Sequence, residues 1–251
     1  MPRRVNIIPL AGAGQRFIEQ GYTTPKPLID INGKPMVVRA AESLPAADLW
    51  IFVCRREHIE EFAIDQKLAS FFSPCDIVIA EKLTEGQAST CLLAATKLKD
   101  DDLVTVGACD NAMRWQSQAY NQLATAGDVD FIVWTFRGNA AVLKDPGMYG
   151  WVKVNAGGAV ESVSVKKPIS LNPINDHAVV GAFTFRTAKM FRESIAAMIQ
   201  AEGRINGEFY LDNAVNFALA MGLNGRVLNV EEYFCWGTPD ELNKYLCHNK
   251  L

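Results

Sequence analysis

The sequence predicts an α/β fold in which a mixed, mainly parallel sheet is flanked by helices. Short apolar runs alternate with helical patterns through the first half of the chain, and a glycine-rich loop directly follows the first apolar run. Alternation of strands and helices is typical of parallel sheets covered on both faces, a Rossmann-like arrangement. Such sheets bind ligands beyond the carboxyl ends of their strands, so the loops there are the first candidates for a site.

The first half of the chain accounts for the parallel part of this sheet. Apolar runs predict buried strands over residues 5–10, 49–54, 76–80, 103–107 and 131–135. Helical patterns between them predict helices over residues 36–44, 58–72, 87–98 and 116–126.

The second half changes character. Residues 150–154 and 160–166 predict a hairpin around Ala156-Gly157-Gly158, and strands are also expected over 179–186 and 225–230. Helices are expected over 187–201 and 211–221, with a last one from Pro239. We expect one domain over residues 1–251, in which 136–251 completes the sheet begun by 1–135.

Composition narrows the class of protein. With 49% hydrophobic residues, the 251-residue chain can bury a sizeable core, and its net charge of −3 provides no basic field for nucleic acid. The apolar run at the start is too short for an export signal, and no run approaches a membrane span. The six cysteines form no CxxC pair, so we expect reduced thiols, no zinc site and a cytoplasmic protein.

The loop after the first strand is a candidate phosphate site. It reads Leu10-Ala11-Gly12-Ala13-Gly14, and Arg16 follows two residues later. Glycines let backbone N–H groups approach a phosphate, and the arginine fork suits phosphate oxygens. Phe17 stands where the dinucleotide-binding fingerprint needs a third glycine, and Gln15-Arg16 break the P-loop pattern. Taken alone, the loop is equally compatible with a tight turn.

Three further residues have chemistry suited to bound phosphates. Lys26 stands between Pro25 and Pro27, which restrict the backbone on both sides of a cation. Asp110 follows the apolar run 103–107, and Asp212 stands at the start of a predicted helix. Two carboxylates from different halves of the chain could hold one Mg²⁺ against phosphate oxygens, although an aspartate in such a position also serves as a helix cap.

Together these motifs resemble the sugar-phosphate nucleotidylyltransferase family, whose signature is a glycine-rich loop ending in arginine, followed by Pro-Lys-Pro. The resemblance extends along nearly the whole chain in matching order. Its further segments are Glu85-Gly86-Gln87-Ala88, Asp110-Asn111, Tyr149-Gly150, Lys166-Lys167-Pro168, Glu208-Phe209-Tyr210-Leu211-Asp212 and Gly237-Thr238-Pro239. It implies a fold of the nucleotide-diphospho-sugar transferase type.

The resemblance also implies a reaction: transfer of a nucleoside monophosphate from an NTP to a small phosphorylated substrate, with release of pyrophosphate. Arg16 and Lys26 would be catalytic, and Asp110 and Asp212 would hold Mg²⁺. The nucleotide would be bound by Leu10, Ala11, Gly12, Ala13, Gly14, Glu85, Gly86 and Gln87. The acceptor would be bound by Tyr149, Gly150, Lys167 and Glu208.

Two departures from the family pattern bear on the substrates. Lys166 stands where the family has an acidic residue that contacts sugar hydroxyls, which favours an acceptor more anionic than a neutral hexose phosphate, or one that is not a sugar. Ala11 replaces a usual glycine, as in small cytidylyltransferase-like members linked to bacterial capsule and other surface polysaccharides. On that resemblance CTP is favoured, although Gln87 can pair with either base edge.

Two other functions could use the same sheet or the same residues. A nucleotide-sugar-dependent glycosyltransferase can share the sheet but usually carries Asp-x-Asp, whereas Asp110 has no second carboxylate beside it. A non-catalytic nucleotide sensor could keep the same residues. Oligomerisation is compatible with the resemblance, but the sequence defines no interface.

Overall fold

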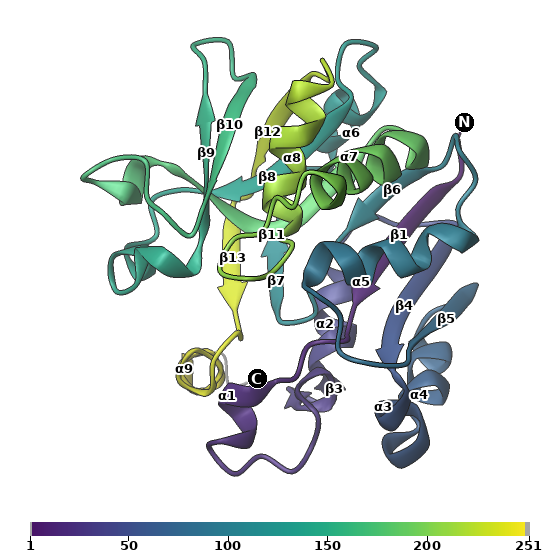
Figure 1. The fold of residues 1–251 in the computed structure, drawn as a ribbon. Coiled ribbons are helices and arrows are strands. Elements are labelled where there is room, and N and C mark those ends of the chain that lie inside the picture. Colours follow the sequence, from purple (N-terminus) through teal and green to yellow (C-terminus); the bar gives the residue numbers. More distant parts are fainter. Residues whose placement is uncertain (1, 249–251) are drawn as a thin grey trace.

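A computed structural model describes residues 2–248, in which nine strands form one sheet flanked by helices (Figure 1). Along the main path of the sheet the strand order is β10-β9-β11-β6-β1-β4-β5, and β8 joins β11 to β12. The strands are β1 (Arg4–Pro9), β4 (Leu49–Arg55), β5 (Cys75–Ala80), β6 (Leu103–Val106), β8 (Phe131–Phe136), β9 (Gly150–Val154), β10 (Val160–Val165), β11 (His177–Phe185) and β12 (Gly225–Asn229).

Helices cover both faces of this sheet. The α-helices of the described residues are α1 (Gln15–Ile18), α2 (Met36–Glu42), α3 (Arg56–Phe62), α4 (Ile64–Phe71), α5 (Gln87–Leu93), α6 (Ser117–Thr125), α7 (Ala188–Gln200), α8 (Leu211–Ala220) and α9 (Pro239–His248). Strand β1 shows how the faces alternate: Val5 and Ile7 pack in one core with α5, α7 and α8, and Ile8 packs in the other with α2, α4 and α6. This follows from the period of two along a strand.

The parallel part of the sheet matches the sequence-based prediction. β1 lies between β4 and β6, parallel to both, and β5 pairs in parallel with β4. The expected mixed, mainly parallel sheet is therefore confirmed. The carboxyl ends of β1 and β6 lie side by side, so the residues that follow Pro9 and Val106 meet at one edge.

Strand β11 joins the two halves of the sheet. Its first residues pair with β9, its last residues pair with β6, and β8 lies along its other side, all antiparallel. The register shifts between Val179 and Phe183, around Gly181 with φ +86°. Such a bulge bends a strand, and the β9–β10 hairpin accordingly stands apart from β1, β4 and β5 (Figure 1).

Two short antiparallel pairs were not predicted from the sequence. β7 (Asn111–Arg114) pairs with β13 (Glu232–Cys235), and β2 (Asp30–Ile31) pairs with β3 (Lys34–Pro35). The first pair carries the C-terminal segment back to the glycine-rich loop, where Trp236 and Leu242 pack against Phe17 in a third apolar cluster. A continuous helix over 58–72 was also expected, but Ala63 in the left-handed region (φ +50°) divides it into α3 and α4.

The remaining elements are single turns of 3₁₀ helix. They are η1 (Lys26–Leu28), η2 (Ala94–Lys97), η3 (Ala140–Leu143), η4 (Pro146–Met148) and η5 (Pro173–Asn175). The expected helix over 87–98 is thus α5 followed by η2. Within residues 2–248, none of the helices combines the length and apolar character needed to cross a membrane.

Candidate active site

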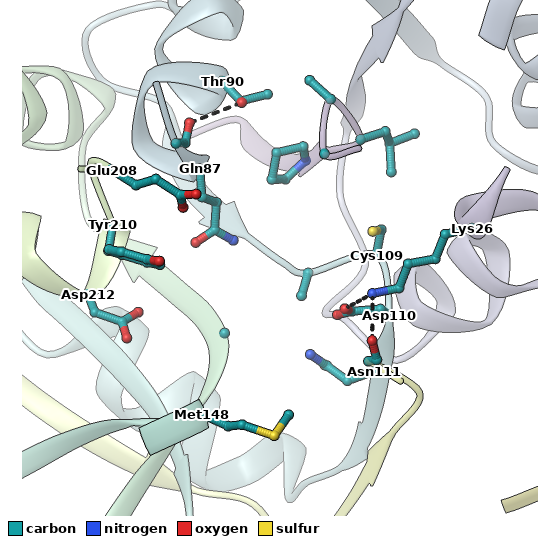
Figure 2. Close-up of a pocket in the computed structure, with 18 of the residues that line it drawn as sticks. Lys26, Gln87, Thr90, Cys109, Asp110, Asn111, Met148, Glu208, Tyr210 and Asp212 are labelled. Atoms are coloured by element: carbon teal, nitrogen blue, oxygen red, sulfur yellow. Dashed lines mark hydrogen bonds and ion pairs between the residues drawn. The ribbon is translucent and has the colours of Figure 1, made fainter. Parts of the chain in front are cut away.

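A cavity of about 550 Å³ opens at the carboxyl ends of the strands, between the glycine-rich loop and the bulge of β11 (Figure 2). The first half of the chain provides the loop after β1, the segment after β6 and the loop before α5. The second half provides the end of β10, the start of β9 and the segment that leads into α8. The site residues predicted from the sequence all line this cavity, except Glu85 and Lys167.

The glycine-rich loop forms one wall. Gly14 has φ +66°, in the left-handed region that favours glycine, and it turns the chain into α1. A Cβ atom on Gly12 would meet nothing within 4 Å, so the backbone there faces open space. Arg16 lines the cavity from α1 with an exposed side chain. Backbone N–H groups and a guanidinium that border an open cavity can bind an anion.

Lys26 is the partly buried cation of this wall. Its position on η1, next to Pro25 and Pro27, brings Nζ to 2.5 Å from Asp110 Oδ2, and Nζ also donates to the Gly237 carbonyl at 3.2 Å. Burial acts to lower the pKa of Lys26, but the Asp110 carboxylate outweighs it and the pKa is raised. Lys26 therefore stays charged at neutral pH and partly neutralises Asp110.

The second carboxylate, Asp212, lies across the cavity from Asp110 (Figure 2). It stands in the first turn of α8 and is half-buried. Burial raises its pKa to about 6, and nearby Lys166 partly opposes the rise. Gly150 faces it, and a Cβ atom at that position would overlap the Asp212 carboxylate. Only glycine at 150 leaves this carboxylate its present place.

The loop before α5 is held by the second half of the chain. Gly86 has φ +127°, and a Cβ atom on it would lie 2.6 Å from the Phe209 carbonyl oxygen. Phe209 N–H donates to the Glu85 carbonyl, and Ala88 N–H donates to the Phe209 carbonyl. Gln87 then begins α5 with its side chain directed into the cavity (Figure 2).

Two predicted site residues are placed differently from expectation. The Glu85 side chain is exposed and pairs with Arg204 at 2.9 Å, so only its backbone takes part in the loop. Lys167 is exposed outside the cavity, and Lys166 lines it in its place. The cause is local: β10 ends at Val165, and the chain turns at Lys166 with φ +56°. Tyr149, Gly150 and Glu208 line the cavity as expected, Glu208 with an exposed side chain.

The model of the MobA-like NTP transferase domain matches residues 7–205, well over half of the sequence. The chain belongs to this family. The resemblance recognised in its motifs is thereby confirmed, and the protein is a nucleotidyltransferase. No curated protein sequence matches the chain at a significant level.

Solved structures of several other proteins have the same fold as this NTP transferase family member. A nucleoside-diphosphate-sugar pyrophosphorylase from Vibrio cholerae RC9 has a TM-score of 0.78 at 22% identity, covering 96% of this chain and 99% of the other. The inositol-1-phosphate CTP transferase from T. maritima has a TM-score of 0.76 at 16% identity, covering 99% and 95%. The UDP-glucose pyrophosphorylase from Acinetobacter baumannii gives 0.70 at 16%, covering 100% and 96%.

Several residues around the NTP transferase cavity were not anticipated. Asn111 lines it and donates from Nδ2 to the Val180 carbonyl at 2.8 Å, which fixes the bulge of β11. The sequence signal that could have identified Asn111 as a cavity residue is its position directly after Asp110, close to the end of a strand. Tyr210 also lines the cavity, and it lies in the segment that carries Glu208 and Asp212. Tyr233, Thr84 and Thr90 line the cavity as well, and nothing in the single sequence marks them.

Two cysteines line the same cavity but are poor nucleophiles. Burial raises the pKa of Cys109 and of Cys235 to about 12, so both thiols stay protonated at neutral pH. A thiol acts as a nucleophile in its thiolate form. Chemistry in this cavity therefore depends on its cations, carboxylates and backbone N–H groups.

Proposed function

We propose that this protein transfers a nucleoside monophosphate from an NTP to a phosphorylated sugar or sugar-like small molecule and releases pyrophosphate. The observation that carries the proposal is the placement of Asp110 and Asp212 on opposite sides of one cavity that also contains Arg16 and Lys26. Cations and separated carboxylates around an open space of about 550 Å³ suit a triphosphate together with a small anionic partner.

Each wall has a part in the reaction. Backbone N–H groups of Gly12 and Gly14 bind the β- and γ-phosphates, and Arg16 neutralises the charge on the leaving pyrophosphate. Lys26 contacts the α-phosphate, where its charge offsets the approach of a second anion. Gln87, at the start of α5, faces the base. Tyr149, Gly150 and Glu208 border the acceptor.

The chemical step is an in-line displacement. An oxygen of the acceptor phosphate, already ionised near pH 7, attacks the α-phosphorus. The bond from the α-phosphorus to the bridging oxygen breaks, and pyrophosphate leaves with its electron pair. No general base is needed, because the nucleophile carries no proton that must be removed. The protein's task is positioning and neutralisation of charge.

The residues present fit a divalent cation. Among residues 2–248, no three or more His, Cys, Asp or Glu side chains gather into a metal cluster. Mg²⁺, however, is commonly held by one or two carboxylates while substrate phosphates complete its shell. Asp212 makes no ion pair with any described residue, and burial has raised its pKa to about 6, so a cation would favour its charged form. Asp110 and Asp212 would hold Mg²⁺, which supplies charge neutralisation on the phosphates.

The choice of CTP is a finer proposal. It is supported by Ala11 in the first loop, which the small cytidylyltransferase-like members share, and by the fold seen in a CTP transferase from T. maritima. The same fold is seen in a UDP-glucose pyrophosphorylase, so the base is decided by experiment.

The experiment is an assay of pyrophosphate release with Mg²⁺, in which each of the four NTPs is tested against a panel of small phosphate esters. We expect release with one NTP, CTP by preference, and one class of acceptor, and no release from the Asp110→Ala variant. Binding of no NTP at all would overturn the proposal.

A further inference from the structure

Adjacent lysines at the end of β10 face different surroundings. Lys166 lines the cavity, whereas Lys167 is exposed outside it. The backbone fixes this difference: Lys166 N–H donates to the Tyr149 carbonyl at 3.0 Å, and Ser164 Oγ donates to the Lys167 carbonyl at 2.6 Å. The backbone of Lys166 has φ +56°, a conformation that residues other than glycine rarely adopt unless their surroundings require it.

The Lys166 ammonium is not neutralised by a carboxylate. In the described part of the chain it makes no ion pair, and its contact is with the ring of Tyr210, 5.2 Å from the centroid. Lys26 on the opposite wall differs, because its Nζ lies 2.5 Å from Asp110. The face of an aromatic ring attracts an ammonium but carries no net negative charge. An ammonium held in this way therefore keeps much of its capacity to bind an anion.

Lys166 lies near Asp212, one of the two carboxylates proposed to hold Mg²⁺, and its charge opposes the rise of that carboxyl's pKa. Its wall otherwise carries Glu208 and Asp212, which would repel an approaching phosphate dianion. A cation here therefore favours the approach of an anion. Among the described residues that line the cavity, the lysines and arginines are Arg16, Lys26 and Lys166, and Lys166 is the one on this wall.

We infer that Lys166, and not Lys167, binds the phosphate of the acceptor and holds it for attack on the α-phosphorus. The inference rests on the proposed function and refines it. It identifies the acceptor by its charge: a phosphate monoester whose dianion is received by an ammonium between Tyr210 and Asp212. Lys167 takes no part in binding.

The test compares three variants with the wild type: Lys166→Gln, which removes the charge and keeps a polar side chain, Lys166→Arg, and the matched control Lys167→Gln. Pyrophosphate release is measured at saturating NTP with glucose 1-phosphate, inositol 1-phosphate or glycerol 3-phosphate, whichever the wild type uses. Loss of a charged hydrogen bond predicts a rise of about 10- to 100-fold in the KM for the acceptor in Lys166→Gln. The KM for the NTP and the melting temperature should stay unchanged.

The arginine variant should recover most of the acceptor affinity, and Lys167→Gln should resemble the wild type. The acceptor KM should also rise with salt in the wild type and much less so in Lys166→Gln, because the screened charge is gone. An active wild type in which Lys166→Gln is unaffected, or in which Lys167→Gln is the weaker binder, overturns this inference alone. A wild type that uses no NTP–acceptor pair overturns the proposed function and the inference together.

Discussion

At the scale of single residues, the ion pair between Lys26 and Asp110 links two proposed roles. The Asp110 carboxylate offsets the effect of burial on Lys26 and raises the pKa of that lysine. The same carboxylate is one of the two that we place against a divalent cation. A change at Asp110 therefore removes a proposed metal ligand and also the carboxylate that raises the pKa of Lys26.

The variant Asp110→Asn should lower kcat/KM for pyrophosphate release by at least about 100-fold, because both functions of the carboxylate are lost. Its side chain volume is nearly unchanged, so the fold should be retained, which a melting curve can verify. Asp240→Asn is a suitable control, since Asp240 is exposed in the first turn of α9. Retention of more than about a tenth of the activity would contradict the role of Asp110.

Gly150 offers a second test at this scale, because its lack of a side chain gives Asp212 its place. In Gly150→Ala the new Cβ atom would overlap the Asp212 carboxylate, which must then move. We expect kcat to fall by about tenfold or more with only a modest loss of stability. Gly127→Ala is the control, because a Cβ atom there meets nothing within 4 Å. Equal activity of the two variants would show that the position of Asp212 is unimportant.

At the scale of elements, the sequence predicted the strands that lie in the core of the sheet, because their side chains are apolar on both faces. It failed where structure depends on contacts between distant segments. Nothing local marks the pairing of β7 with β13, and no glycine or proline marks the break at Ala63 between α3 and α4.

The same limit applies to the site. The family pattern pointed to Lys167 as the lysine for the acceptor phosphate. Which of two neighbouring lysines faces the cavity depends on the turn that follows β10, where Lys166 has φ +56°. Two adjacent lysines give no local signal for such a turn, whereas Asp110 was predictable because it follows an uninterrupted buried strand.

Helix α3 provides a test of pH dependence. His58 is buried, and its Nδ1 has no hydrogen-bond partner within residues 2–248. Burial lowers the pKa of His58 below its ordinary 6.5, and Arg55 adds to the effect. The unfolded chain therefore takes up a proton near pH 6.5 that the folded protein resists, so stability is lost as the pH falls below that value.

The expected result is a drop in melting temperature between pH 7.5 and pH 5.5 that is smaller in His58→Gln than in the wild type. The comparison uses the change with pH within each protein, so a constant loss of stability in the variant does not affect it. A control variant is His248→Gln, because His248 lies exposed in the last turn of α9. If the wild type and His58→Gln lost the same number of degrees, His58 would not be the group that titrates.

At the scale of the whole molecule, β11 connects the two halves of the sequence within one sheet. It pairs with β6 from the first half and with β8 and β9 around the boundary. One core also contains α5 from the first half together with α7 and α8 from the second. A ligand in the cavity would contact loops from both halves, so its binding energy would stabilise the whole sheet.

We therefore expect residues 1–251 to unfold in one cooperative transition, and an NTP with Mg²⁺ to raise the midpoint of that whole transition. At a ligand concentration of about 100 Kd the gain is about 2.7 kcal/mol, which corresponds to a shift of roughly 5–10 °C for a chain of this size. Far-UV circular dichroism and fluorescence of the five tryptophans, which are distributed from Trp50 to Trp236, should give the same midpoint. Lys26→Met, which lacks a cation for the phosphates, should unfold in one transition but show a smaller shift with nucleotide. Two separate transitions, or a shift seen by one method only, would mean that the halves fold independently and that the cavity lies between two domains instead of within one.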